Sequence, residues 1–250
     1  MRTIRVAPHV HSEWSYDAEW PLGDLVGSFR ERGYDAVLMA EHDRGFDDAR
    51  WDAYRAACAD ASTEELLLVP GMEYEDSASL VHVPVWGVDL PFLGAARPTE
   101  ELLRDAKGHD AFTVFAHPAR REAIRSFRPE WTQYLDAVEI WNRHYDGIAP
   151  YPRGRNFAAT QGLRPFAALD FHTRRQFFPL ALTLEVAEPV SAATVVEALR
   201  AGRFRVEAFG TSALRFTSGI PGTALRTGER LRRSIRGPVR RAQKLAGRRD

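Results

Sequence analysis

The sequence predicts an α/β fold in which a parallel sheet is covered by helices on its outer side. Two observations support this prediction: short continuous apolar runs alternate with amphipathic segments, and polar side chains that can bind metal follow several of those runs. The 250 residues, 44% hydrophobic and 27% charged, fit one large globular domain. About seven strand–helix units would close into a slightly distorted TIM-like barrel, in which the carboxyl ends of the strands meet at one face.

The first half of the chain shows the alternation most clearly. We expect strands over 4–7, 35–40, 66–73 and 80–88, and helices over 21–33, 46–61 and 99–107. The first of these helices has both terminal signals, because Pro21 stands at its start and Gly33 at its end.

The second half repeats the scheme. We expect strands over 112–116, 137–142, 165–169 and 204–209, and a helix over 191–200 that Ser191 caps. These elements predict a barrel domain over residues 1–210, followed by an extension over 211–250.

That extension is basic, although the net charge of the whole chain is zero. Residues 211–250 contain eleven basic and two acidic residues, so the preceding part is acidic, with 23 basic and 32 acidic residues. Apolar residues fall near helical spacing in it, interrupted by Gly237-Pro238; they are Leu231, Ile235, Val239, Ala242 and Leu245. Such an extension could bind nucleic acid, anionic lipid or the acidic body of its own protein, or could be a solvated, partly disordered end.

Other features predict a cytoplasmic protein. The first ten residues lack the apolar core of a signal peptide, and no apolar run approaches the ~18 to 20 residues of a membrane span. Cys58 is the single cysteine and cannot form an internal disulfide, which agrees with a reducing compartment. Its expected role is to fill the core.

The stretch from His9 to Asp17 is the first candidate for a metal site. Residues two apart in a strand point to the same side, so His9 and His11 can present two imidazoles to one point, and a loop can bring Asp17 back to it. Taken alone, the pair fits equally well with histidines that are satisfied by hydrogen bonds.

The positions of the other histidines favour the metal site. Nine residues fall at or near expected strand ends: His9, His11, Asp17, His42, Glu73, His82, His117, Asp170 and His172. Imidazole and carboxylate ligands suit Zn²⁺, Mn²⁺ or Fe²⁺. Nine ligands are too many for one ion, so we expect two or three divalent ions that share a bridging carboxylate. Such sites activate water and hold phosphoryl oxygens. His82 could instead be a half-buried strand residue.

The order of these motifs resembles the PHP (polymerase and histidinol phosphatase) superfamily of metal-dependent phosphoesterases. The resemblance spans residues 4 to about 209. Its motifs are His9-x-His11, Ser15-x-Asp17, Glu41-His42-Asp43, Pro70-Gly71-Met72-Glu73, His82, Ala116-His117-Pro118 and Asp170-x-His172. The resemblance implies a distorted (β/α)7 barrel. It also implies a first metal on His9, His11, Glu73 and Asp170, a second on Asp17, His42 and His172, and a third on Glu73, His82 and His117, with Glu73 bridging.

Glu41 departs from the family pattern, in which threonine more often precedes the histidine. It could weaken the access of phosphate, or support a metal ligand from behind. The role of Glu139 also has two alternatives: it could orient a ligand histidine, or it could pair with a basic residue on an outer helix.

These observations predict a metal-dependent hydrolase of phosphate esters, acting as a phosphomonoesterase on a phosphorylated small molecule or nucleotide. Arg120 or Arg121 could clamp phosphate, and His144 could bind phosphate or protonate the leaving oxygen, although plain surface roles fit Arg120 and His144 as well. One alternative is a nuclease or nucleotide phosphodiesterase acting on single-stranded nucleic acid, which would use the basic extension. Another is a metal-containing binding module without turnover. The sequence does not predict the oligomeric state.

Overall fold

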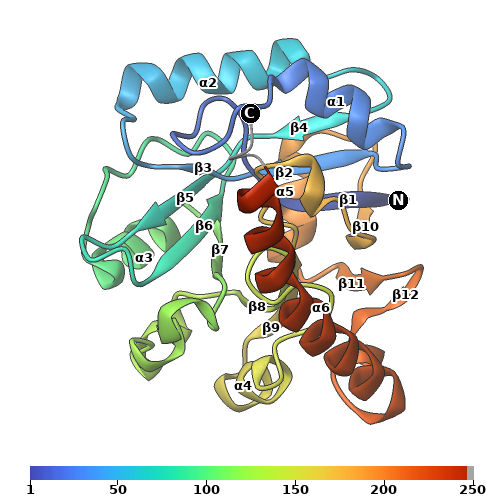
Figure 1. The fold of residues 1–250 in the computed structure, drawn as a ribbon. Helices are drawn as coiled ribbons and strands as arrows, with labels where there is room; N and C mark the ends of the chain where they lie inside the picture. Colours follow the sequence, from blue (N-terminus) through green and yellow to red (C-terminus); the bar gives the residue numbers. More distant parts are fainter. Residues whose placement is uncertain (247–250) are drawn as a thin grey trace.

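The structure, a computed structural model, describes residues 1–246 of the chain, and the side chains of residues 1–121 and 123–235. The architecture is mixed α/β (Figure 1). The helices are α1 (Leu22–Arg30), α2 (Asp48–Ala61), α3 (Thr99–Gly108), α4 (Gly154–Gln161), α5 (Ala192–Arg200) and α6 (Gly219–Ala246). The strands are β1 (Arg2–Val10), β2 (Ala36–Met39), β3 (Glu41–His42), β4 (Leu67–Val69), β5 (Met72–Glu75), β6 (His82–Trp86), β7 (Phe112–Phe115), β8 (Ala137–Asn142), β9 (Arg164–Ala168), β10 (Leu180–Val186), β11 (Phe204–Ala208) and β12 (Thr211–Ser212).

The strands form two six-stranded sheets, in the orders β12-β11-β10-β1-β2-β4 and β3-β5-β6-β7-β8-β9. Parallel pairs join β1 to β2 and β2 to β4 in the first sheet, and β3 to β5, β7 to β8 and β8 to β9 in the second. The arrangement is less uniform than the parallel sheet that the sequence predicts. Strand β10 is antiparallel to both of its neighbours β1 and β11, and β6 is antiparallel to β5 and β7.

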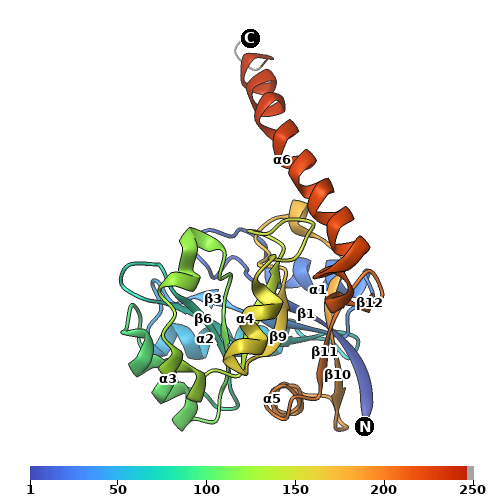
Figure 2. The same ribbon diagram turned by 90° about the horizontal axis from the view of Figure 1, so that it is seen from below.

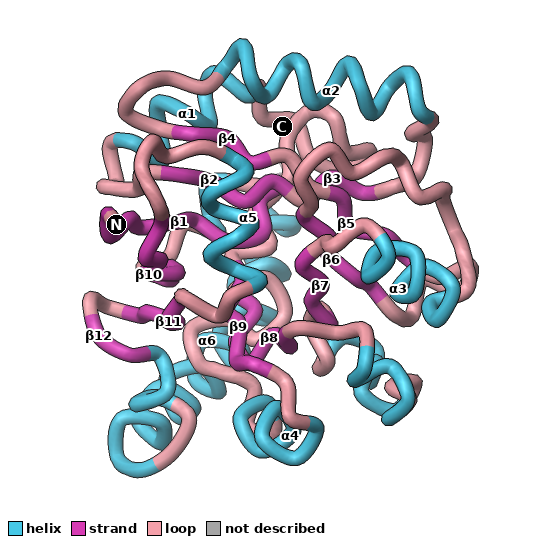
Figure 3. The backbone as a smooth tube through the Cα atoms, turned by 180° about the vertical axis from the view of Figure 1, so that it is seen from behind, coloured by secondary structure: helices cyan, strands magenta, loops and turns pink. Residues whose placement is uncertain are grey.

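The two sheets are joined along their edges. Beyond the end of β9, Leu169 N donates to Pro8 O at 2.9 Å, and His11 N donates to Phe171 O at 3.0 Å. On the other side, β2 continues into β3 across Ala40, and β4 continues into β5 across two residues. Helices α1 and α2 lie along one side of the strands, and α3 and α4 lie at the periphery (Figure 3).

The helices cover the sheets with the faces that the sequence pattern indicates. Helix α1 buries Leu22, Leu25, Val26 and Phe29. Ser191 caps α5 as predicted, because its side chain accepts a hydrogen bond from Thr194 N at 3.2 Å. Helix α5 contacts β4, β7 and β10 at one end of the strands, and α6 lies on the opposite side (Figure 2).

Several elements differ from the expected ones. Strand β10 and helix α4 were not predicted, and the expected strand over 66–73 is two strands, β4 and β5. The expected interruption at Gly237-Pro238 is wrong, because α6 is continuous through it. The side chains of Val239, Ala242 and Leu245, and all of residues 247–250, lie outside the described part. Within residues 1–246, none of the helices combines the length and apolarity that crossing a membrane requires. Cys58 is a free thiol buried in α2.

Candidate metal centre

The nine predicted ligand residues come together at one end of the strands. Eight of them are buried, and only Asp17 has a partly exposed side chain, at 36%. His82 is 3% exposed and faces the other ligands, so it is not the half-buried strand residue that its apolar neighbours allowed.

Irregular backbone at the strand ends turns several of these side chains inward. His9, His117 and Asp170 all have a positive φ, of 61°, 25° and 48° respectively. Few residues other than glycine adopt this region, and such residues often cluster at functional sites. The pairing of β1 with β2 also shifts register between Ala7 and Val10. At this point the two imidazoles of the first motif meet, with His9 Nε2 3.1 Å from His11 Nε2.

Glu73 lies at the middle of the cluster. Its Oε2 atom is 3.3 Å from His9 Nε2, 3.6 Å from His11 Nε2 and 3.3 Å from His42 Nδ1. Its Oε1 atom is 3.0 Å from His117 Nε2 and 3.2 Å from His82 Nδ1. One carboxylate therefore faces two groups of imidazoles, so Glu73 is the residue that would be shared if two ions were bound here.

Asp170 and Asp17 complete two of the groups. Asp170 Oδ1 is 3.5 Å from His11 Nε2 and 4.0 Å from His9 Nε2. Asp17 Oδ2 is 3.4 Å from His42 Nε2 and 3.3 Å from His172 Nε2. Side chains that can hold a metal ion thus form overlapping clusters here.

The spacing and chemistry of these atoms fit divalent ions. Two ligand atoms that each lie ~2.1 Å from a tetrahedral ion are ~3.4 Å apart, close to most of the separations in this cluster. Among the described residues, no hydrogen bond reaches the buried Nδ1 atoms of His42 and His82, and both face Glu73. Buried polar atoms without a partner are costly, and an ion would satisfy them.

Glu139 supports the cluster from behind. Its Oε1 atom lies 2.8 Å from His9 Nδ1. In the tautomer with the proton on Nδ1, Glu139 accepts this hydrogen bond, and Nε2, which faces Glu73 and His11, is able to bind a metal ion. Its Oε2 atom accepts from His117 N at 2.7 Å and from Asn142 Nδ2 at 2.8 Å. Of the two contacts that the sequence left open for Glu139, the structure has the one with a candidate ligand histidine, His9.

Glu41 is also buried behind the ligands. It accepts hydrogen bonds from Ser12 N at 3.1 Å, and from the hydroxyls of Ser12 and Ser15 at 2.6 Å each. The Ser15 hydroxyl in turn contacts His11 Nδ1 at 3.2 Å and accepts from His42 N at 3.0 Å. Glu41 therefore fixes the loop that carries two candidate ligands. Burial raises the pKa of its carboxyl, and the serine hydrogen bonds oppose that effect.

The ionisable side chains of the cluster shift one another's pKa values. Burial alone would raise the pKa of Glu73, but the imidazoles of His9, His82 and His117 lower it well below its usual range. Burial would lower the pKa of His42, yet Asp17 and Glu73 raise it to about 9. The carboxylates therefore stay ionised, and their negative charge favours a cation at the centre of the cluster.

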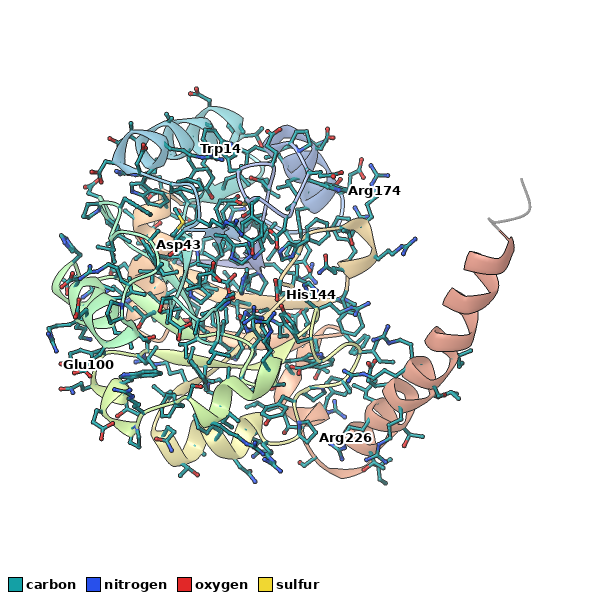
Figure 4. All side chains as sticks on the ribbon, turned by 60° about the vertical axis from the view of Figure 1, so that its left-hand side comes forward. Trp14, Asp43, Glu100, His144, Arg174 and Arg226 are labelled. Atoms are coloured by element: carbon teal, nitrogen blue, oxygen red, sulfur yellow. The ribbon has the colours of Figure 1, made fainter. Side chains whose placement is uncertain are left out.

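The two predicted catalytic residues lie near the cluster, in different settings. Arg120 donates to Tyr145 Oη at 3.0 Å, to Ser79 O at 2.6 Å and to Ser79 Oγ at 3.1 Å, so its guanidinium braces two loops. His144 is 41% exposed, with Nδ1 3.7 Å from Asp170 Oδ1. Figure 4 shows it among the central side chains, with Arg226 farther out at the base of α6. Arg121 is exposed and has a φ of 44°.

A cavity of about 880 Å³ opens beside the cluster. Asp17, His144 and His172 line it on the metal side. Its lining also includes four arginines, namely Arg143, Arg175, Arg232 and Arg233. Arg232 and Arg233 belong to the basic extension, but the group as a whole was not predicted, because its members come from three separate segments.

Comparison with solved structures relates this fold to known proteins. A two-domain protein from Bacteroides vulgatus that contains a predicted PHP-like metal-dependent phosphoesterase aligns with a TM-score of 0.61 and 18% identity, over 83% of this chain and 65% of that one. PsfC from Pseudomonas syringae aligns with a TM-score of 0.59 and 16% identity, over 83% of this chain and 92% of that one. Endonuclease Q, in a complex with duplex DNA that has an abasic lesion at the active site, aligns with a TM-score of 0.57 and 13% identity, over 80% and 57% of the two chains.

The chain thus spans less than two thirds of the length of the Bacteroides protein and of Endonuclease Q. Sequence comparison found neither a matching family model nor a matching curated protein. The similarity lies in the fold, and it agrees with the order of the metal-site motifs: this chain has the fold of the PHP-like metal-dependent phosphoesterases.

Proposed function

We propose that this protein is a metal-dependent phosphoesterase that hydrolyses phosphate monoesters of a small molecule or nucleotide. The main support is Glu73, whose two carboxylate oxygens face imidazoles that come from four strand ends. The distorted (β/α)7 barrel that the motifs imply belongs to the same proposal, since a barrel brings strand ends to one face.

The residues divide into three ligand sets around two or three ions of Mn²⁺, Zn²⁺ or Fe²⁺. His9, His11, Glu73 and Asp170 would hold the first ion, and Asp17, His42 and His172 the second. Glu73, His82 and His117 would hold the third. Each set includes a carboxylate and at least two imidazoles, a mixture that suits these ions.

The chemistry follows from these sets and from the side chains around them. When bound, divalent ions of this kind lower the pKa of a water molecule and balance negative charge on phosphoryl oxygens. His144 lines the cavity beside the cluster and is half-exposed, so it can hold a phosphate oxygen or give a proton to the leaving oxygen. Arg120 is proposed as the phosphate clamp; it would exchange its contacts with Ser79 for phosphate oxygens.

The test combines metal analysis of the purified protein with a screen for phosphate release from sugar phosphates, nucleotides, histidinol phosphate and phosphotyrosine peptides. We expect two or three divalent ions per chain and turnover of at least one monoester, both lost in Glu73→Gln. Arg120→Gln and His144→Gln should retain metal and lose turnover. A protein that binds the ions but hydrolyses no phosphate ester would instead be a binding module.

A nuclease or nucleotide phosphodiesterase is the second candidate, favoured by the structural similarity to Endonuclease Q and by the arginine-lined cavity. Comparing hydrolysis of a mononucleotide with that of a single-stranded oligonucleotide separates the two. Greater activity on the oligonucleotide, lost on truncation after residue 211, would favour the nuclease.

A further inference from the structure

We propose that α6 completes the substrate cavity, and that Arg232 and Arg233 on this helix, with Arg143 and Arg175, bind a second phosphate group of the substrate. This inference rests on the proposed function, because it assumes that the scissile phosphoryl group lies at the metal cluster. It narrows the substrate class to phosphate monoesters that carry another phosphate.

The first support is the shared cavity. Asp17 and His172 line one part of it, and Arg232 and Arg233 line another. Its volume of about 880 Å³ lies within the range of small-molecule sites, and far exceeds what one phosphoryl group fills. In the described part of the chain, no hydrogen bond or ion pair joins Arg175, Arg232 or Arg233 to any of the nine candidate ligands. The guanidinium groups of these three arginines are therefore not engaged by the candidate ligands.

The second support is the fixed position of the two arginines on α6. Glu229 is 6% exposed and accepts from Arg232 Nε and Nη2 at 2.7 Å each, and from Arg233 Nε at 2.6 Å. Ile148 N donates to the same carboxylate at 3.1 Å. Gly147 permits this approach, since a Cβ there would overlap the Glu229 carboxylate.

Arg233 also ties the helix to the loop after β8. Its Nη2 atom donates to Tyr145 O at 3.0 Å and to Asp146 O at 3.1 Å. Among the described residues, the Nη1 atoms of Arg232 and Arg233 have no hydrogen-bond partner. Each guanidinium is thus held in place while its Nη1 donors stay available. Binding an anion therefore costs less side-chain conformational entropy.

The third support comes from the rim opposite α6. Arg175 is exposed, and no described residue forms a hydrogen bond or ion pair with its guanidinium. Arg143 Nη2 donates to Arg175 O at 3.3 Å, and its guanidinium packs over the Phe178 ring at 5.1 Å from the centroid. Arg143 therefore holds the segment that presents Arg175 to the cavity.

The charge balance around these arginines favours a dianion. Four guanidinium groups line this part of the cavity, and one carboxylate, that of Glu229, pairs with two of them, Arg232 and Arg233. A guanidinium group can form two parallel hydrogen bonds to phosphate oxygens. A site with several guanidinium groups therefore suits a doubly charged phosphate better than a singly charged carboxylate.

The experiment uses the full chain with Mn²⁺ and p-nitrophenyl phosphate as a reporter substrate. Competitive inhibition constants, Ki, are measured for glucose 1-phosphate and glucose 1,6-bisphosphate, which differ by one phosphate. In the wild-type protein we expect the Ki of glucose 1,6-bisphosphate to be at least about tenfold lower than the Ki of glucose 1-phosphate. Arg232→Gln and Arg233→Gln should each reduce that ratio several-fold. Arg230→Gln, on the same helix but outside this cavity, is the matched control and should keep the ratio.

The outcomes separate this inference from the proposed function. Without any phosphate release from p-nitrophenyl phosphate or the broader screen, the proposed function fails, and this inference with it. With turnover present, equal Ki values for the two sugar phosphates, or a ratio unchanged in both glutamine variants, would overturn the inference alone. The melting temperatures of the two glutamine variants show whether α6 stays docked. A ratio that falls only in variants with a lower melting temperature would assign the effect to undocking of α6 and would overturn the phosphate-binding role of Arg232 and Arg233.

Discussion

The side chain of Glu139 determines how His9 can act as a ligand. A histidine that binds a metal through Nε2 must carry its proton on Nδ1, and the Glu139 carboxylate is placed to accept a hydrogen bond from His9 Nδ1, at 2.8 Å. The same carboxylate holds the backbone at His117. It therefore positions two candidate ligands from different strands without facing Glu73 itself.

Glu139→Gln should weaken metal binding without unfolding the protein. The amide nitrogen would face either His9 Nδ1 or His117 N, both of which donate, so one contact is lost. We expect the affinity for Mn²⁺ or Zn²⁺ to fall about 10- to 100-fold, measured by competition with a coloured chelator. Glu64→Gln removes an exposed carboxylate as the control. Equal affinities in Glu139→Gln and the wild type would refute the positioning role.

Single residues near strand ends were the most predictable part of the site. Imidazoles and carboxylates after apolar runs identify candidate ligands because parallel strands deliver their ends to one face. The supporting role of Ser12 was not predictable, since it depends on a hydrogen bond to Glu41, 29 positions away. The group of cavity arginines was not predicted either, because its members are far apart in the sequence.

Among the elements, the break between β4 and β5 is important because it places Glu73. The chain passes through Pro70-Gly71, and the Trp86 indole of β6 lies against Gly71 while it donates to Met39 O at 2.6 Å. A side chain at residue 71 would overlap both Trp86 and Met39 O. Glycine is therefore required for β5 to approach β3 and β6.

Gly71→Ala should lower the free energy of unfolding by about 1–3 kcal/mol, the usual cost of overpacking a buried site. Urea denaturation measures this change. Gly27→Ala, in α1, is the control, because a Cβ there meets nothing within 4 Å and should stabilise the helix by about 0.5–1 kcal/mol. Similar stability changes in the two variants would contradict the packing explanation.

The docking of α6 should depend on pH through Glu229. Burial would raise the pKa of this carboxyl above its ordinary value of 4.5, but hydrogen bonds from Arg232 and Arg233 lower it to about 2. A lowered folded-state pKa means that the ionised group stabilises the folded protein above pH 4.5, and that this contribution is lost as the pH falls through 2.

The comparison of the wild type with Glu229→Gln tests this dependence. The difference in their free energies of unfolding, from urea titrations at several pH values, should be largest above pH 4.5 and should shrink below it. A difference that stays constant over this range would mean that the ionised carboxylate does not stabilise the docked helix.

Elements with strong local signals were predicted, and those set by tertiary contacts were not. The capped α5 and the amphipathic α1 follow from residues within each helix. Strand β10 forms because β1 and β11 lie on either side of it, and its antiparallel direction has no local signal. The continuity of α6 across Gly237-Pro238 runs against the local preference of both residues.

At the scale of the whole molecule, the fold serves to gather residues that are far apart in the sequence. His9 and His172 are separated by most of the chain, yet both lie beside the same carboxylate, that of Asp170. The division into a body over residues 1–210 and a basic extension stays a prediction. The ties from α6 to Tyr145, Asp146 and Ile148 show that residues 229–233 are bound to the body.

The most direct test of the central claim is anomalous X-ray diffraction from crystals grown with Mn²⁺. If the nine residues share a small cluster of ions, the anomalous map will show two or three peaks within coordination distance of their side chains. Glu73 will lie between two of these peaks. A map with no peak at Glu73, from crystals in which these side chains are ordered, would contradict it.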